Sequence, residues 1–322
     1  MRVLVTGCAG FIGMHCALRL LARGDEVLGA DNLSPYYDVR LKEARLRQLQ
    51  ALPGFRFERT DLADAAACAR LFEAARPERV LHLAAQPGVR YSFENPASYI
   101  QSNLVAFANL LEACRRHAPA HLVYASSSSV YGASAKLPWS EADNVDHPIS
   151  LYAATKKANE LMAHVYSHLH GLPATGLRYF TVYGPWGRPD MSPMLFARAI
   201  LEGRPIQVFN HGDMKRDFTY IDDAVEATVR VLDLPPAEKP PHRVLNVGNH
   251  QPVGLLEYIA LLERALGKKA IREMKPMQPG DVPATYADTR SLEALTGFAP
   301  ATPLAEGLAR FAEWFKSYRS EA

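Results

Sequence analysis

The sequence is poor in cysteine, carries almost no net charge and contains no long apolar run. Its four cysteines have no metal-type spacing, and Cys8 lies in a glycine-rich turn that a disulfide would disrupt. We therefore expect reduced cysteines, no bound metal and a cytoplasmic protein. The 36 basic and 34 acidic residues leave a net charge of +2, which gives no electrostatic reason to expect nucleic acid or an anionic membrane as a partner.

No uninterrupted apolar stretch approaches the roughly 20 residues that a membrane-spanning helix needs. Arg2 followed by apolar residues is similar to the start of a signal peptide, but His15 and Arg19 interrupt the stretch. The 322 residues, 48% of them hydrophobic and 22% charged, are those of a globular protein with a sizeable core. A small molecule is therefore the expected ligand.

Apolar segments of strand length alternate with amphipathic segments of helix length through the first 180 residues. The expected strands cover residues 2–6, 26–30, 55–59, 79–85, 121–125 and 174–179, and the expected helices cover 14–23, 38–50, 63–75, 96–117 and 151–170. This alternation predicts an α/β fold, a Rossmann-type doubly wound parallel sheet of about seven strands. Ligands in such a sheet bind at the carboxyl ends of the strands.

The alternation becomes irregular after residue 180. Strand-like pieces at 206–209, 218–221 and 243–247 are separated by helices near 193–202, 223–232 and 255–266, and a last helix covers 304–318. We expect residues 1–180 to form an NAD-binding domain, with parts of about 210–250 returning to it. Residues 181–322 are expected to form most of a smaller C-terminal α/β substrate domain.

Three glycines, Gly7, Gly10 and Gly13, separate the first expected strand from the first helix. Glycine lets the backbone approach a phosphate closely, and the free N–H groups at a helix start attract the anion. By itself the spacing also suits a tight turn without a ligand. Asp31 favours a ligand, because an acid after the second strand can bind ribose hydroxyls and would repel a 2′-phosphate. Together the two features predict NAD rather than NADP.

Asp61 follows the third expected strand, where an aspartate is equally suited to cap the next helix or to bond the adenine of a dinucleotide. Residues 79–85 end in small side chains, which would let a cofactor approach. Ser34 and residues 36–38 could either contact the cofactor or only fold over it.

Tyr152 and Lys156 stand four residues apart, hence on one face of one helix, and Ser127 follows a strand 25 residues earlier. A phenol has a pKa near 10, so a nearby ammonium and a positive nicotinamide ring are needed before it can act as a base at neutral pH. A serine hydroxyl can hold the substrate oxygen and relay the proton. The three residues predict a site that removes a hydroxyl proton while hydride leaves carbon.

The sequence resembles the extended short-chain dehydrogenase/reductase family, and within it the nucleotide-sugar epimerases. The matching motifs are Thr6-Gly7-x-x-Gly10-Phe11-Ile12-Gly13, Asp31-Asn32, Asp61-Leu62, His82-Leu83-Ala84-Ala85, Tyr152-x-x-x-Lys156 and the segments 126–132, 178–185 and 216–223. The resemblance implies a catalytic triad of Ser127, Tyr152 and Lys156. It also implies NAD contacts from Gly7, Gly10, Phe11, Ile12, Gly13, Asp31, Asn32, Asp61, Leu62, Leu83, Ala84, Ala85, Gln86, Asn103, Ser126, Tyr152, Lys156 and Tyr179.

A UDP-sugar substrate follows from the same resemblance. Arg216 would hold its diphosphate, Val208 and Phe209 would lie near the uracil, and Asp281 would lie near the ribose. The remaining contacts expected for the substrate come from Arg90, Ser127, Ser128, Ser129, Thr181 and Arg188. The resemblance further implies a homodimer, paired through the helices expected at 96–117 and 151–170.

Narrower features are similar to the UDP-glucuronate 4-epimerases, namely the segments 31–42 and 86–92. Thr181 stands where glucose/galactose epimerases usually carry asparagine. Arg188 taken alone suits a solvated loop, but its guanidinium also matches the two oxygens of a sugar carboxylate.

Residues 127–132 read Ser-Ser-Ser-Val-Tyr-Gly, without the acid that dehydratase and decarboxylase relatives carry there. Ser128 or Ser129 could share the role given to Ser127. We therefore predict 4-epimerisation of UDP-glucuronate to UDP-galacturonate through a 4-keto sugar. The alternatives are a UDP-glucose/UDP-galactose 4-epimerase, a UDP-glucuronate decarboxylase and a non-catalytic NAD-binding sensor.

Overall fold

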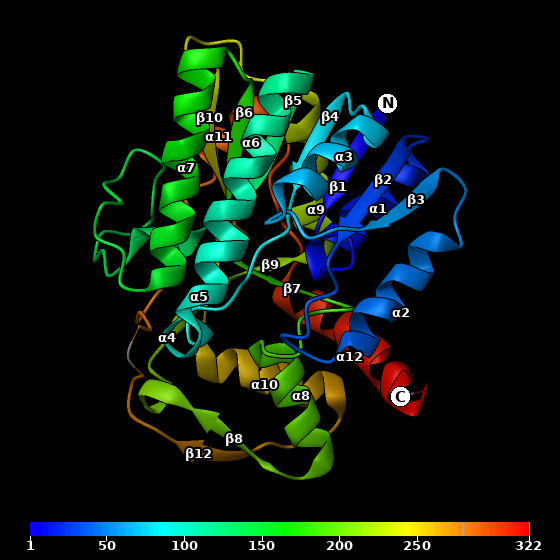
Figure 1. Cartoon of the computed structure of the whole chain (residues 1–322). Helices are drawn as coiled ribbons and strands as arrows, with labels where there is room; N and C mark the ends of the chain where they lie inside the picture. The colour runs from blue at the N-terminus through cyan, green and yellow to red at the C-terminus, as the bar shows by residue number, and fades with distance from the viewer. Residues whose placement is uncertain (279, 322) are drawn as a thin grey trace.

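A seven-stranded parallel sheet forms the centre of the computed structural model, which describes residues 1–278 and 280–321 (Figure 1). The strand order is β10-β6-β5-β4-β1-β2-β3. The bounds are β1 Arg2–Thr6, β2 Glu26–Asp31, β3 Phe55–Arg59, β4 Arg79–His82, β5 His121–Ser127, β6 Ala174–Tyr179 and β10 His242–Val247. The order reverses between β1 and β4, which pair with each other, so a crevice opens at their carboxyl ends. The predicted doubly wound sheet is confirmed.

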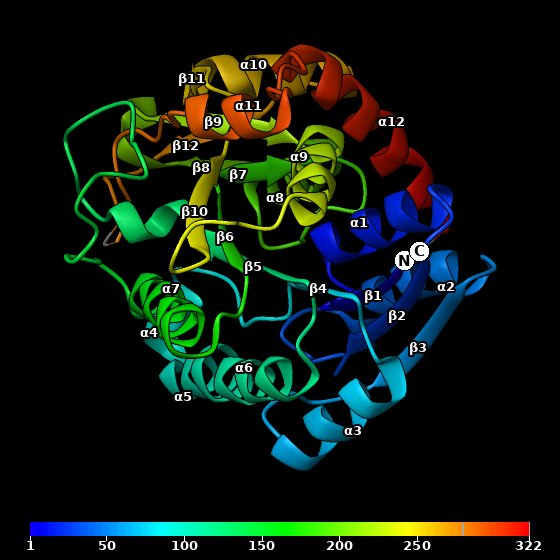
Figure 2. The ribbon, with the colours of Figure 1, turned by 90° about the horizontal axis from the view of Figure 1, so that it is seen from above.

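Helices cover both faces of this sheet (Figure 2). One face carries α1 Phe11–Ala22, α2 Val39–Gln50, α9 Ile221–Asp233 and α11 Arg290–Thr296; the other carries α3 Ala65–Ala75, α6 Ala106–His117 and α7 Leu151–His170. Val3 and Val5 pack into the hydrophobic cluster on the α1 side, whereas Leu4 packs into the cluster on the α3 side. The period of two along β1 therefore places buried side chains on both faces, as a central parallel strand requires.

The chain after β6 also forms two smaller sheets and further helices. β7 Thr181–Tyr183 and β11 Pro252–Gly254 flank β9 Lys215–Tyr220, and β12 Ile271–Met274 pairs with β8 Pro205–Val208. The helices are α8 Ser192–Glu202, α10 Leu255–Leu266 and α12 Leu304–Glu321. β10 pairs with β6 in the central sheet, whereas β9 pairs with β7 and β11. The division into a cofactor part and a substrate part stays a prediction.

The helix expected over 96–117 is present as one continuous helical run, but it contains a π-helical segment. Short helices α4 Tyr91–Glu94 and α5 Pro96–Tyr99 precede a π-helical segment, Ile100–Val105, which leads into α6. Asn103 in this segment is buried, accepts a hydrogen bond from Gln86 N and donates to Thr155 Oγ1. The wider π turn thus brings Asn103 between the loop after β4 and α7, a placement that helical periodicity does not encode.

The start of the third helix also differs from the expectation. α3 begins at Ala65, and the Asp64 carboxylate accepts hydrogen bonds from two backbone N–H groups of its first turn. Asp61 instead accepts from Ala63 N at 2.9 Å and from Asn32 Nδ2 at 3.2 Å. Asp61 is therefore not the helix cap, and its role as a cofactor ligand stays a prediction.

In the described part of the chain, no helix combines the length and apolar character of a membrane span. Nor does any group of three or more His, Cys, Asp or Glu side chains among these residues suit a metal ion.

Two buried histidines, His82 and His121, and two half-buried ones, His15 and His242, predict loss of stability in mild acid. Burial lowers the pKa of His15, His121 and His242 to about 4 and that of His82 to about 3. Below the ordinary value of about 6.5 the unfolded chain then binds more protons than the folded one, so stability falls as pH drops from 6.5 toward 4. We expect a lower urea midpoint at pH 5 than at pH 7.5, followed by circular dichroism. Equal midpoints would contradict this account.

Candidate active site

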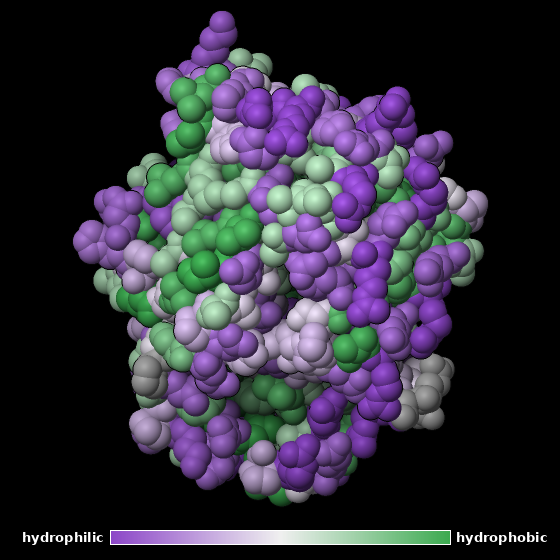
Figure 3. Space-filling view, in the orientation of Figure 1, coloured by the Kyte–Doolittle hydropathy of each residue, from purple (hydrophilic) through white to green (hydrophobic). Residues whose placement is uncertain are grey.

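One large cavity, about 1030 Å³, runs from the glycine turn after β1 to the smaller sheets. The face of the molecule seen in Figure 3 is hollowed below its middle, between the central sheet and the lobe that contains α8 and α10. Every residue predicted for the site lines this cavity except Asn103 and Val208. Asn103 lies behind Gln86, and Val208 is completely buried in the core.

The glycine turn has no room for side chains. A Cβ added to Gly13 would lie 2.0 Å from Gly7 O, and one added to Gly7, whose φ is +71°, would lie 2.6 Å from Ala84 N. Gly10 precedes α1, and no side chain among the described residues caps this helix start. The first turn of α1 therefore offers backbone N–H groups to an anion.

Asp31 fixes the adjoining wall of the cavity. Its Oδ2 accepts a hydrogen bond from Ala9 N at 3.1 Å, and its Oδ1 accepts from Leu33 N at 2.8 Å. Each carboxylate oxygen has two lone pairs, so both can also accept from ribose hydroxyls. The narrow turn and this carboxylate fit NAD.

Tyr152 and Lys156 project from the start of α7, where the Ser150 side chain caps the helix by accepting from Ala153 N. Lys156 Nζ donates to Ala125 O at 2.9 Å, and burial lowers the pKa of Lys156 to about 8. The ammonium therefore remains largely protonated at pH 7. The contact joins α7 to the end of β5.

Ser127 ends β5, and its hydroxyl donates to Ser129 Oγ at 3.1 Å. Ser128 and Ser129 begin a short 3-10 helix, Ser128–Tyr131, and all three serines line the cavity. Burial raises the pKa of Tyr152, while a hydrogen bond with Ser127 and the charge of Arg188 oppose the rise. The sequence analysis did not anticipate this effect of Arg188.

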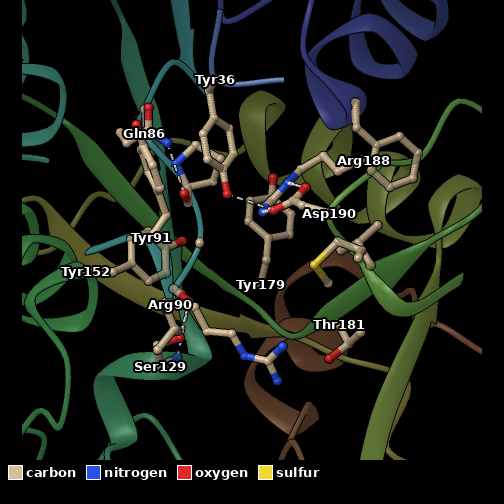
Figure 4. A pocket seen from close by; sticks show the side chains of 18 of the residues that line it. Tyr36, Gln86, Arg90, Tyr91, Ser129, Tyr152, Tyr179, Thr181, Arg188 and Asp190 are labelled. Atoms are coloured by element: carbon tan, nitrogen blue, oxygen red, sulfur yellow. Dashed lines mark hydrogen bonds and ion pairs between the residues drawn. The ribbon is translucent and has the colours of Figure 1, made fainter. Parts of the chain in front are cut away.

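Arg188, in the loop after β7, forms an ion pair with Asp190 on one side of the cavity (Figure 4). Arg188 Nε donates to Asp190 Oδ1 at 3.0 Å, and Tyr36 OH donates to Asp190 Oδ2 at 3.0 Å. The sequence analysis missed Asp190 altogether. For Tyr36, the sequence offered only its position in residues 36–38, shortly after the NAD motif Asp31-Asn32.

The opposite end of the cavity contains the residues predicted for the uridine diphosphate. Arg90 Nη2 lies 3.3 Å from Asp281 Oδ2, and its guanidinium lies over the Phe209 ring. Arg216 lines the same end and donates to Pro283 O at 3.3 Å. These aromatic, acidic and basic groups are of the kinds that could bind a base, a ribose and two phosphates, and their assignment to the uridine diphosphate stays a prediction.

Comparison with known proteins settles the family. The model of the NAD dependent epimerase/dehydratase family matches residues 3–248. This chain belongs to that family. A probable UDP-glucuronate 4-epimerase of Rhizobium meliloti (strain 1021) is 52% identical, over 99% of this chain and 98% of the relative. UDP-glucuronate 4-epimerase 3 of Arabidopsis thaliana is 49% identical, over 98% of this chain and 76% of the relative.

A solved UDP-glucuronic acid 4-epimerase from Bacillus cereus, in complex with UDP-glucuronic acid and NAD, has the same fold. Its TM-score is 0.92 at 33% identity, over 99% of this chain and all of the relative. The protein is an NAD-dependent nucleotide-sugar epimerase. The predicted family, enzyme class and cofactor are confirmed.

A buried network lies behind the predicted catalytic residues of the epimerase. Glu160, two turns after Tyr152 on α7, accepts from Ser126 Oγ at 2.6 Å and from Arg178 Nε and Nη2 at 2.8 Å. Arg178 also donates to the Tyr131 hydroxyl at 3.0 Å. The network ties α7 to β5 and to the 3-10 helix, and the sequence analysis did not single out Glu160.

Arg45 connects the glycine turn after β1 to the loop after β7. This completely buried guanidinium donates to Ala9 O at 3.2 Å, to Trp186 O at 2.7 Å and to Gly187 O at 3.0 Å. Its other partner is the Tyr37 hydroxyl, at 2.6 Å. The glycine turn and the loop that presents Arg188 are thereby fixed to one side chain.

Proposed function

We propose that this epimerase interconverts UDP-glucuronate and UDP-galacturonate through a 4-keto sugar. The observation that carries the proposal is that Arg188, Thr181 and Ser129 line the same cavity as Tyr152, and that Ser129 stands where dehydratases and decarboxylases carry an acid. A guanidinium, and hydroxyls that can donate, are the groups expected to bind a carboxylate. The names of the relatives at 52% and 49% identity support the same substrate.

Tyr152 would take the proton of the sugar 4-hydroxyl, and Ser127 would hold that oxygen. Bound in its oxidised form, NAD supplies the hydride acceptor and a positive charge that favours the phenolate. The 4-keto sugar then turns about its diphosphate linkage and presents its other face. Return of the hydride to that other face of C4, and of the proton from Tyr152 to the C4 oxygen, completes an inversion that consumes no cofactor.

The intermediate is a β-keto acid, and such acids readily lose carbon dioxide. Decarboxylation needs the bond between C5 and the carboxyl carbon to align with the π system of the ketone. We assign to Arg188 and Thr181 the task of holding the carboxylate out of that alignment. Arg216, Arg90, Phe209 and Asp281 would hold the UDP, with the backbone of β8 beside the uracil.

Two other reactions of the family are the rivals, 4-epimerisation of UDP-glucose and decarboxylation of UDP-glucuronate. Incubation of the NAD-loaded enzyme with each sugar, followed by proton NMR of the products, distinguishes all three. We expect UDP-galacturonate from UDP-glucuronate, little conversion of UDP-glucose and no UDP-pentose. A dominant UDP-galactose or UDP-pentose product would replace the proposal with the corresponding rival.

We also propose a homodimer formed through α7 and the helices before it. Leu161, Val165 and Leu169 lie at four-residue intervals on α7 and are 55%, 48% and 66% exposed. Ile100, in the π-helical segment, is 39% exposed. Hydrophobic side chains gather over α7 and α6 in Figure 3, as expected of a helical interface.

Sedimentation at micromolar concentration is expected to show a dimer, and Val165→Glu should shift it to monomer because a buried unpaired carboxylate opposes association. Leu52→Glu, a matched change at an exposed leucine outside α7, should leave the dimer intact. A wild-type protein that sediments only as a monomer would refute the homodimer.

A further inference from the structure

The carboxylate of Asp190 already occupies two donors of Arg188. Arg188 Nε lies 3.0 Å from Oδ1, and Nη2 lies 2.5 Å from Oδ2. The Arg188 and Asp190 side chains are only 22% and 29% exposed. Burial would lower the pKa of Arg188, but the charge and hydrogen bonds of Asp190 outweigh it and raise the pKa above its ordinary value. The pair is therefore fully charged, and its net charge is close to zero.

Tyr36 holds Asp190 from the other side. Its hydroxyl donates to Asp190 Oδ2 at 3.0 Å, and its ring packs on Tyr91 with centroids 4.8 Å apart. Tyr36 belongs to the segment 32–38, in which Ser34 also lines the cavity. Asp190 is thus held in place by a segment that adjoins the NAD motif.

Gly88 marks the point where these groups meet. A Cβ added there would lie 2.8 Å from the Tyr36 hydroxyl and 3.8 Å from Arg188 Nη2, so only glycine leaves room for the cluster. The charged and titratable groups that face Arg188 come from five elements or loops. They are Asp190 in its own loop, Tyr36 after β2, Arg45 on α2, Tyr99 on α5 and Tyr152 on α7.

We propose that Asp190 is a positioning residue that limits how tightly Arg188 holds the carboxylate of the sugar, and that Tyr36 fixes Asp190 for this task. The proposal rests on the function proposed above. An unpaired arginine can form two parallel hydrogen bonds to a carboxylate and presents a full positive charge. In Arg188, Nε and Nη2 already donate to Asp190, and the negative charge of Asp190 offsets the positive charge of the guanidinium.

A weak interaction between Arg188 and the carboxylate suits this reaction because the keto sugar must turn before it is reduced. A contact to the carboxylate that is made before the turn has to break during it. An interaction that stabilises the bound ground state more than the turning state lowers KM without raising kcat. Asp190 would therefore lower the affinity for UDP-glucuronate and let the keto intermediate turn more easily.

The test is Asp190→Asn, which keeps the shape of the side chain and one acceptor but removes its charge. We expect KM for UDP-glucuronate to fall about threefold to tenfold while kcat does not rise. The inhibition constant of UDP-glucose, which lacks the carboxylate, should stay within about twofold of the wild-type value. An unchanged or raised KM for UDP-glucuronate would overturn the proposal, as would an equal shift for both sugars.

Asp38→Asn is the matched control. Asp38 pairs with Arg40 at the same two-residue spacing and in a similar two-contact geometry, but in an exposed position outside the cavity lining. Asparagine also caps a helix as well as aspartate does, so α2 should keep its start. This variant should behave as wild type with both sugars.

A pH profile separates a failure of this inference from a failure of the proposed substrate. In Asp190→Asn the uncompensated Arg188 should lower the pKa of Tyr152, so the acid limb of the profile should move about one unit to lower pH. Arg188→Ala should move that limb to higher pH, and the double variant should match Arg188→Ala. The measurement works on whichever UDP-sugar is turned over. An unmoved limb in Asp190→Asn would show a purely structural role for Asp190 and overturn the inference even if UDP-glucuronate is the substrate.

Discussion

Replacing Tyr152 by phenylalanine is expected to lower kcat by roughly 10²–10⁴-fold, the usual contribution of a positioned acid–base group. The phenolic oxygen is the only atom lost, and it lies beside Ser127 and Arg188, which both oppose the rise of its pKa. The ring remains in contact with Tyr99, with centroids 6.1 Å apart, so the helix start and the cavity should keep their shape.

Binding of NAD should survive this change, because the glycine turn and Asp31 are untouched. Tyr166→Phe on the same helix is the control, since its hydroxyl bonds only Glu112 on α6 among the described contacts. Steady-state kinetics and fluorescence titration with NAD provide both readouts. A Tyr152→Phe enzyme that keeps more than about a tenth of the wild-type kcat would show that another group moves the proton.

Replacing Arg188 by alanine is expected to lower kcat/KM for UDP-glucuronate by one to two orders of magnitude. A charge-assisted hydrogen bond to a carboxylate is worth roughly 1.5–3 kcal/mol, which corresponds to that range. The loss also withdraws a positive charge that opposes the rise in the pKa of Tyr152. Part of the effect should therefore disappear at higher pH, whereas the part that depends on the carboxylate should persist.

UDP-glucose isolates the part that depends on the carboxylate, because it has the same UDP and hexose ring but offers no carboxylate. Its inhibition constant should hardly change in Arg188→Ala. A carboxylate that is no longer held can align with the ketone, so the variant should also release some UDP-4-keto-pentose and retain NADH, visible by absorbance near 340 nm. Equal losses of affinity for the two sugars would show that Arg188 does not contact the carboxylate.

The central sheet could be predicted from the sequence because its signals are local. Val3, Leu4 and Val5 are apolar on both faces of β1, and Gly7 stands where only a residue without a side chain fits. The signal of Tyr152 and Lys156 is also local, because their four-residue spacing places them on one face of a helix whatever surrounds it. Chemistry that depends on one turn of one helix can be found in the sequence alone.

The residues that were missed have partners far along the chain. Arg45 bonds the carbonyls of residues 186 and 187, and Glu160 bonds Arg178 and Ser126. Each side chain has the sequence pattern of an exposed helix charge. Their burial follows from the packing of α2 and α7 against the loops and strands, which no local pattern encodes.

Short strands were missed for a related reason. β7 and β11 have three residues each, and β12 has four, too few to show a period of two. Their stability comes from pairing with β9 and β8. The loop after β7, which presents Arg188 and Asp190, therefore could not be oriented from the sequence.

UDP-glucuronate labelled with deuterium at C4 provides the most direct test of NAD-dependent 4-epimerisation of the uronate. The NAD-loaded enzyme would be incubated with this substrate in ordinary water, and the products examined by NMR and mass spectrometry. The account predicts UDP-galacturonate that keeps the deuterium at C4, because the hydrogen leaves carbon and returns to it within one site. Loss of the label to water, or a labelled UDP-pentose as the main product, would contradict it.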